Sequence, residues 1–456
     1  MRPAIHINAP WRAEIRATSR LAGPLVITQL AQFSLSLTDT ILIGRLGGEA
    51  LAAVGLASTL YIVAYLLCMG ILAAVPPLAA QAYGARNPRL MRRTIRQGLW
   101  ISVMLGILAI GALWPAEQIF LMLGQAPDLT AVSQEYVRAA IWGIAPGLCV
   151  IAMRGFISVM DRPNFILIVM LTGFTVNALA DYAFIFGVWG FPKLEVMGVG
   201  LATTFTNFAM CAAIMLISMK ANRLRRYNVL GRFWRPDWSV LRDILKVGLP
   251  ISAMIMMEHS LFASATFMMG NLGTAEVAAH TIALQLAATS FMVPLGIGQA
   301  AVIRVGLAVG RNDIAGVRRA GWLAIGLGFT FMFGPAVLFA IAPRFLIGLF
   351  LDIGDPVNAD VLALGISYLL IAAIFQLSDG IQCIAAHALR GLSDTRVPML
   401  IAGLSFLVIG FPSAFYTAFY TPLRGDGIWW GLFIALSLVA VLLSIRFHHQ
   451  TKKQLK

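Results

Sequence analysis

The stretch Leu-Gly-Gly-Glu-Ala-Leu-Ala-Ala at residues 46–53 returns as Leu-Gly-Thr-Ala-Glu-Val-Ala-Ala at residues 272–279, an offset of 226 residues. The same offset aligns further residues on both sides without a gap, from residue 24 to residue 93 of the first copy. The aligned pairs are Pro24 with Pro250, Gly44 with Gly270, Gly70-Ile71 with Gly296-Ile297, Gly84 with Gly310, and Arg92-Arg93 with Arg318-Arg319. The chain is therefore built from two halves that repeat each other.

Composition places this repeat in a membrane. The 456 residues are 59% hydrophobic and 12% charged, with a mean hydropathy of +0.83, whereas soluble domains are typically about 45–50% apolar and about 25% charged. The apolar residues form blocks long enough to cross a hydrocarbon core as helices. Twelve blocks predict spans at about 20–43, 51–80, 98–123, 131–158, 163–188, 196–219, 247–271, 277–303, 320–343, 359–389, 397–420 and 427–446.

The repeat sets the expected architecture. Because each half holds an even number of spans, equivalent helices cross the membrane in the same direction, which is one of the known transporter plans. The sequence thus predicts an all-α integral membrane protein with twelve transmembrane helices in two six-helix lobes related by a parallel internal repeat. The expected domains are an amino-terminal lobe at 1–219, a basic cytoplasmic linker at 220–246, and a carboxyl-terminal lobe with a short tail at 247–456.

The positive charges sort by loop. Of the 34 Lys and Arg residues, 29 fall at the termini, in every second loop or close beside them. The five exceptions are Arg45, Arg138, Lys193, Arg344 and Arg424. By the positive-inside rule, this distribution predicts a multi-pass protein of the cell inner (cytoplasmic) membrane with both termini in the cytoplasm. Since the net charge of +14 forms no single patch, no nucleic-acid partner is expected.

Four acids fall deep inside the predicted spans: Asp39, Asp181, Glu258 and Asp379. A charged side chain at the centre of a bilayer costs about 2.5–3.5 kcal/mol on insertion scales. No Lys or Arg lies mid-helix nearby in the sequence, so each acid would be stabilised by a proton, by a bound cation, or by a permanent hydrogen bond in its neutral form. The first two options predict switchable cation sites, in which all four acids are candidate ligands of a metal ion such as Na⁺.

The neighbours of these acids differ between the halves. Asn177 and Asp181 share one helical face at i, i+4 spacing, and with Asp39 and Thr203 they would form an oxygen-rich cluster suited to a hard cation such as Na⁺. Glu258 instead lies among flexible or aromatic residues, which suit a polyspecific pocket for lipophilic cations or are ordinary apolar filler. These neighbours are Met254, Met256, Met257, Phe262, Met268 and Met269.

Signatures of enzymes are missing from the sequence. It contains no His-Glu-x-x-His, Gly-x-Ser-x-Gly or Walker lysine motif, so we expect no enzyme activity, no nucleotide partner and no cofactor. The energy for transport would then come from an ion gradient, with Na⁺ or H⁺ as the transported coupling ion.

Several motifs together resemble the multidrug and toxic-compound extrusion (MATE) family, in its NorM-like branch. They are Asp39–Gly47, Gln81–Ala85, Phe375–Asp379 and Arg390–Pro398. The resemblance spans nearly the whole chain and implies a two-lobed bundle of twelve helices that expels organic cations in exchange for Na⁺ or H⁺.

The resemblance also implies roles for particular residues. Glu258 and Asp379 fall on the coupling acids of the carboxyl lobe, and Gln285 falls near positions that face the substrate. We expect Gln32, Met257 and Phe262 to contact substrate as well. The residues implied for the cation site of the amino lobe are Asp39, Asn177, Asp181 and Thr203. Asp181 departs from the Asn frequent in the NorM-like branch, so the lobe that carries coupling stays open.

The resulting hypothesis is a monomeric antiporter that works by alternating access and whose partners are organic cations and membrane lipid. A flippase for lipid-linked precursors, from the same wider superfamily, is the alternative. Flippases of that kind usually carry cationic residues for a pyrophosphate, whereas the deep charges here are acidic. An ion channel would pass currents far faster than a carrier turns over, and a membrane-embedded enzyme lacks a nucleophile–base pair.

Overall fold

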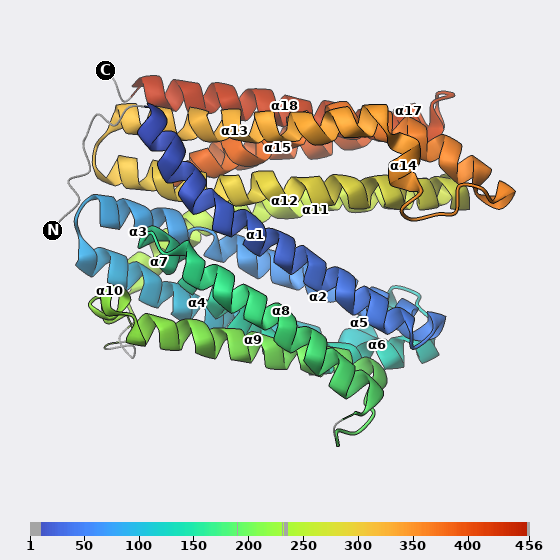
Figure 1. Ribbon diagram of the computed structural model, residues 1–456, viewed down its shortest axis with the longest axis horizontal. Coiled ribbons are helices and arrows are strands. Elements are labelled where there is room, and N and C mark those ends of the chain that lie inside the picture. Colours follow the sequence, from blue (N-terminus) through green and yellow to red (C-terminus); the bar gives the residue numbers. More distant parts are fainter. Residues whose placement is uncertain (1–10, 189, 230, 232–235, 454–456) are drawn as a thin grey trace. The chain divides into compact units, whose positions relative to one another are not determined.

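The computed structural model describes residues 11–188, 190–229, 231 and 236–453. The regular structure in these residues is helical. Up to the linker the main helices are α1 (Trp11–Gly44), α2 (Gly48–Leu72), α3 (Val75–Gly84), α4 (Pro88–Leu113), α5 (Ala116–Met122), α6 (Pro127–Ala140), α7 (Ile144–Val159), α8 (Pro163–Phe186), α9 (Glu195–Lys220) and α10 (Asn222–Arg225). They are followed by α11 (Trp238–Leu272), α12 (Thr274–Gly310), α13 (Ile314–Ile341), α14 (Pro343–Ile347), α15 (Ala359–Gly391), α16 (Arg396–Gly403), α17 (Phe411–Phe419) and α18 (Arg424–Lys453) (Figure 1).

The helices are long and apolar enough for the predicted membrane protein. Within the described residues, eleven helical stretches could cross a membrane by length and composition. The 35-residue α11 is a twelfth helix of sufficient length and carries Glu258 in its interior. Many outward-facing side chains are large and apolar, such as Ile107, Phe267 and Leu400. Apolar surface on this scale needs an apolar environment, which supports the predicted twelve-helix membrane fold.

Helix ends extend beyond the apolar blocks. α4 begins at Pro88, ten residues before the predicted span, and the Asn87 side chain caps it by accepting a hydrogen bond from the backbone N–H of Leu90. α11 likewise begins at Trp238, so residues 238–246 are helical. The domain boundaries expected from the repeat, at residues 219 and 247, remain a prediction.

The chain forms two compact units. One, here called the amino unit, is Ile27–Ser252, and the other, the carboxyl unit, is Met1–Val26 with Ala253–Lys456. The first part of α1 thus belongs to the carboxyl unit, and the first part of α11 belongs to the amino unit. The two boundary residues, Val26 and Ser252, are separated by the repeat offset of 226 and each follows an in-helix proline by two residues, Pro24 or Pro250. Each unit thus contains the opening segment of the other repeat, and these two exchanged segments end at equivalent positions of the repeat.

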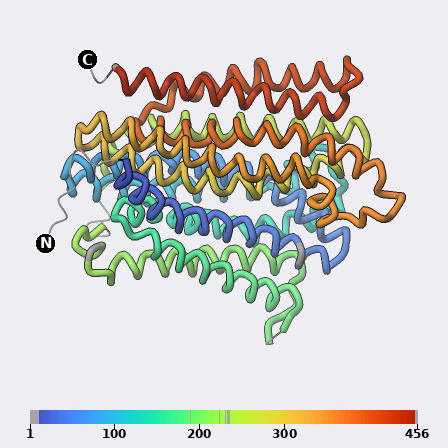
Figure 2. The backbone as a smooth tube through the Cα atoms, turned by 45° about the horizontal axis from the view of Figure 1, so that its top comes forward, coloured from blue at the N-terminus to red at the C-terminus, as the bar shows by residue number. Residues whose placement is uncertain are grey.

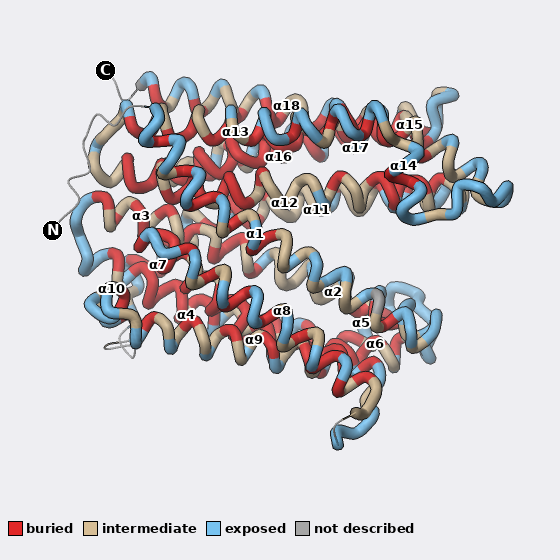
Figure 3. Tube along the Cα trace, viewed as in Figure 1, coloured by how far each residue is buried: buried red, intermediate tan, exposed pale blue. Residues whose placement is uncertain are grey.

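In the amino unit, α4 packs on α7, while α8 and α9 lie side by side. Figure 3 shows α7 as mostly buried. The first part of α11 is held to this unit by specific contacts. The Ser252 hydroxyl donates to the backbone oxygen of Leu67 at 2.7 Å, and Arg93 of α4 pairs with Asp237 just before α11.

In the carboxyl unit, α15 packs against α12, α13 and α18, as the neighbouring traces in Figure 2 show. An ion pair holds the start of α1 to this unit. Arg304 of α12 donates from Nε and Nη2 to the two carboxylate oxygens of Glu14, at 2.8 and 2.6 Å. Because Glu14 is buried, its carboxylate has lost hydrogen bonds to water, and the two bonds from Arg304 replace them.

Two glycines at equivalent repeat positions admit the exchanged segments. A Cβ atom on Gly70 of α2 would lie 2.4 Å from the Cα atom of Ser252, and one on Gly296 of α12 would lie 2.7 Å from the Cα atom of Val26. Both pairs are related by the offset of 226 residues. Each glycine therefore permits a backbone-to-backbone approach that any side chain would prevent, as small residues commonly do at membrane helix contacts.

Gly70→Ala should lower the stability of the protein by about 1–3 kcal/mol, the usual range for overpacking, because the clash is with backbone. Apparent melting temperatures of the purified protein in detergent would measure the loss. Gly55→Ala on the same helix is the matched control, since nothing lies within 4 Å of its Cβ position and alanine favours a helix over glycine by about 1 kcal/mol. Equal melting temperatures for the two variants would contradict the proposed packing.

Candidate functional site

The amino unit brings two of the predicted acids together. Asp39 of α1 and Asp181 of α8 lie close enough to act on each other electrostatically. Two carboxylates this close repel each other, which favours a proton or a cation on the pair. Asp181 is fully buried, and in the described part of the chain no donor group serves its two carboxylate oxygens or Oδ1 of Asp39. This pair therefore has free acceptors for a cation or a proton.

Further oxygen atoms surround this pair. Tyr136 of α6 lies close enough to act electrostatically on Asp39 and Asp181, and the side chains of Ser58 and Thr203 lie near its hydroxyl. Asn177 is buried one turn before Asp181 on α8. The structure thus gathers the predicted amino-lobe residues and adds Tyr136, which sequence reasoning missed. No spacing in the sequence links residue 136 to residues 39 or 181, since they lie on three different helices.

In the carboxyl unit, a glutamine joins the other two acids. Gln382 of α15 donates from Nε2 to Oε1 of Glu258 on α11 at 2.8 Å and to Oδ1 of Asp379 at 3.3 Å. Glu258 and Asp379 therefore belong to one hydrogen-bonded polar cluster. Sequence reasoning also missed Gln382, although its i, i+3 spacing from Asp379 on α15 could have pointed to it.

The same face of α15 carries more polar groups beyond this cluster. His387 lies with Nδ1 2.8 Å from the backbone oxygen of Cys383 and Nε2 3.3 Å from Nη1 of Arg390. Arg390 attracts the Glu258 carboxylate through space but forms no ion pair with it. A row of polar side chains thus runs along α15 from Asp379 to the last turn at Arg390.

None of the four predicted acids is paired with Lys or Arg within 4.0 Å in the described ranges. In those same residues, no group of three or more His, Cys, Asp and Glu side chains is placed to hold a metal ion. Each acid pair would instead have to complete a cation site with neutral oxygen atoms. Amide and hydroxyl oxygens of this kind are ligands that hard cations accept.

The residues expected to contact substrate are spread over several helices. Gln32 of α1 accepts a hydrogen bond from Nη1 of Arg154 on α7 at 3.1 Å. Met257 of α11 lies beside Gly403 of α16, and Phe262 packs edge-on against Phe375 of α15, with ring centroids 6.2 Å apart. Gln285 is half-buried on α12. Arg154 itself lies inside α7.

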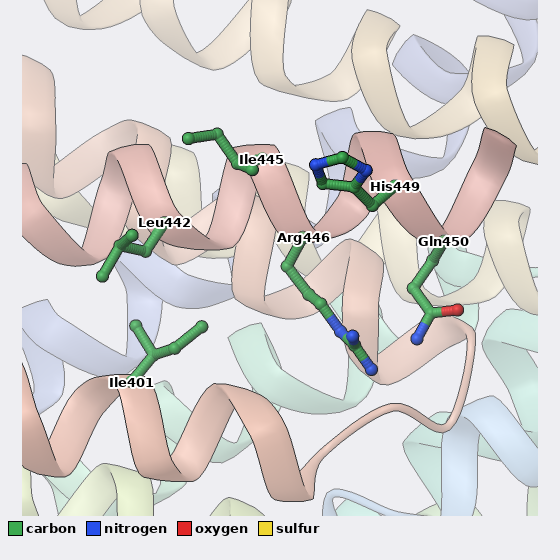
Figure 4. A pocket seen from close by; sticks show the side chains of 6 residues that line it. All are labelled: Ile401, Leu442, Ile445, Arg446, His449 and Gln450. Atoms are coloured by element: carbon green, nitrogen blue, oxygen red, sulfur yellow. The ribbon is translucent and has the colours of Figure 1, made fainter. Parts of the chain in front are cut away.

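A small cavity of about 370 Å³ lies elsewhere in the carboxyl unit, between α16 and α18 (Figure 4). Its walls are Ile401, Leu442, Ile445, Arg446, His449 and Gln450. Arg446 and Gln450 both hydrogen-bond to Oδ2 of Asp394, at 2.8 and 3.0 Å. Two of its polar side chains are thus bound by the protein itself, and no predicted site residue lines the cavity.

Comparison with known proteins agrees with this architecture. The sequence matches the MatE family over residues 24–183 and 250–416. It is 42% identical to the probable multidrug resistance protein NorM of Brucella suis biovar 1 over 447 residues, which covers 98% of this chain and 95% of that protein. The NorM protein of Mesorhizobium japonicum is 41% identical over 439 residues, covering 96% of this chain and 94% of its own length.

Solved structures share the fold. The eukaryotic MATE transporter AtDTX14 superposes with a TM-score of 0.85 at 16% identity, covering 97% of this chain and 98% of that one. A MOP superfamily transporter from Pyrococcus furiosus Vc1 gives a TM-score of 0.87 at 22% identity, with 97% of each chain covered. From the family match and the near full-length identity to NorM proteins, the chain belongs to the MATE family of membrane transporters, in the NorM-like branch, and is not an enzyme.

Proposed function

We propose that the protein is an antiporter that exports organic, mostly cationic and lipophilic compounds across the cytoplasmic membrane in exchange for Na⁺ or H⁺. The observation that carries this proposal is the pair of acid clusters, Asp39 with Asp181 and Glu258 with Asp379, each on transmembrane helices and without a Lys or Arg partner in the described residues. The names of the NorM relatives, which are described as probable multidrug resistance proteins, support drug export.

The physical argument is one of charge balance. A cluster of two carboxyl groups without a cation carries negative charge in a medium where each charge costs about 2.5–3.5 kcal/mol. Binding Na⁺, H⁺ or a cationic substrate removes part of that charge. A bound cation therefore stabilises the conformation that buries the cluster more than the one that opens it to water. This difference in stabilisation is the thermodynamic requirement for coupled exchange.

The two clusters have different chemistry under this proposal. The amino cluster, with Asn177, Thr203 and Tyr136 around its acids, offers several neutral oxygen atoms to a hard cation. In the carboxyl cluster, Glu258 shares α11 with Met257 and with Phe262 one turn later, and side chains of these types suit lipophilic cations. We infer that both termini lie in the cytoplasm, that the protein acts as a monomer in the inner membrane, and that compounds leave the cytoplasm by alternating access.

Asp39→Asn and Asp379→Asn should each insert normally but lose most gradient-driven export, because an amide cannot exchange a proton or balance a cation's charge. Efflux of a fluorescent organic cation from cells expressing each variant measures the loss. Asp128→Asn, in the exposed first turn of α6, is the control and should keep wild-type efflux. Full activity in both buried-acid variants would remove the basis of the coupling argument.

Purified protein in liposomes should move a fluorescent organic cation when an inward Na⁺ or H⁺ gradient is imposed, and stop when the gradient is collapsed. Imposing the Na⁺ and pH gradients separately identifies the coupling ion. Transport that ignores both gradients, or cells that gain no dye resistance, would contradict antiport and would favour a lipid-linked precursor as substrate. Ionic currents much faster than carrier turnover would indicate a channel instead.

A further inference from the structure

We propose that Gln382 is a positioning residue for the coupling cation at the carboxyl cluster. It joins Glu258 to Asp379 as a hydrogen-bond donor when no cation is present, and it supplies its amide oxygen to the cation after a half-turn of the amide. This inference rests on the proposed function, because it assigns a role in ion coupling.

The side chain is placed to act on both acids at once. Gln382 and Asp379 lie one turn apart on α15, while Glu258 comes from α11. The Nε2 atom of Gln382 reaches Oε1 of Glu258 at 2.8 Å and Oδ1 of Asp379 at 3.3 Å. An amide nitrogen carries two protons, so it can serve two carboxylate acceptors together. Gln382 thus bridges the two acids directly.

The other end of the same amide has no partner. Oε1 of Gln382 is buried and receives no hydrogen bond in the described part of the chain, and the whole residue is only 1% exposed. A buried acceptor without a donor is destabilising, and such groups are rare enough in folded proteins to require an explanation. Here the explanation is that the oxygen has a partner in the other state of the transport cycle.

Rotation about the last torsion of glutamine exchanges the two ends of the amide with little rearrangement, because that torsion is broad and roughly two-fold. Oε1 would then occupy the place of Nε2, facing the oxygen atoms of Glu258 and Asp379. Three oxygens repel one another when nothing lies between them, but together they are suitable ligands for a hard cation. The amide therefore donates hydrogen bonds to the two acids when no cation lies between them, and it coordinates the cation when one is bound.

Other charged groups near the cluster do not take this role. Arg390 attracts Glu258 from a distance and contacts His387, and His387 is bonded to the backbone of Cys383. Both lie further along α15 toward its last turn. The bridging position between the two acids is held by Gln382.

The test uses purified protein in liposomes, with the half-saturating concentration of the driving cation and the maximal exchange rate measured separately. Gln382→Met keeps the length and burial of the side chain but neither donates nor coordinates. It should raise the half-saturating cation concentration about tenfold or more, the effect expected for losing a bond to a charged group. The maximal rate at saturating cation should fall much less. A purely structural role would lower the amount of active protein without moving half-saturation.

Gln376→Met is the matched control. Gln376 is also fully buried on α15, but it accepts a hydrogen bond from the Ser290 hydroxyl at 2.9 Å, and no hydrogen bond joins it to Glu258 or Asp379. Its half-saturating concentration should equal that of the wild type. If Gln382→Met cannot be recovered folded, Gln382→Asn, which keeps the amide but shortens the reach, should give the same shift.

The outcomes separate this inference from the proposed function. Wild-type exchange together with unchanged half-saturation in Gln382→Met or Gln382→Asn overturns the role of Gln382 and leaves antiport intact. Wild-type protein that exchanges with no cation overturns both. A shift as large in Gln376→Met as in Gln382→Met also overturns the inference, because the effect would then follow from buried amides in general.

Discussion

A carboxylate inside a hydrocarbon layer is stable only when another group supplies positive charge or a hydrogen bond, and four such groups lie on the membrane helices of this chain. The described structure supplies no Lys or Arg partner within ion-pair distance. It supplies neighbours that leave the acids responsive: another carboxyl group for Asp181, and the amide of Gln382 for Glu258 and Asp379. Neutral partners permit a cation to come and go, whereas a fixed ion pair would occupy the site permanently.

The two repeats resemble each other more closely in their backbone arrangement than in the polar side chains at equivalent positions. Gln32 and Glu258 stand 226 residues apart, at equivalent positions on α1 and α11. Gln32 receives a hydrogen bond from Arg154, and Glu258 receives one from Gln382. One half thus places a cationic side chain beside a neutral amide, and the other places a neutral amide beside an acid. The two halves share a backbone plan but offer different electrostatic environments.

The sequence predicts the twelve spans well because hydropathy reports contact with lipid, and nearly every span is apolar over its length. It is less informative about helix ends, since charged residues such as those between Pro88 and Gln97 continue a helix beyond the lipid. The individual acids are also predictable, because charge is rare in such segments. Their partners are not, since Tyr136, Asp39 and Asp181 meet from three separate helices. Gln382 is closer to prediction, because it shares a helical face with Asp379.

The exchanged helix segments have a consequence for how such a chain could arise. Each bundle is completed by the opening segment of the other repeat, which rests on Gly70 or Gly296. A polypeptide containing one repeat would therefore present an unfilled groove and a protruding segment. Two identical copies could satisfy both needs by trading that segment reciprocally, as in a swapped homodimer. Fusion of the two genes would then make the trade intramolecular, leaving each copy free to diverge in its buried polar chemistry.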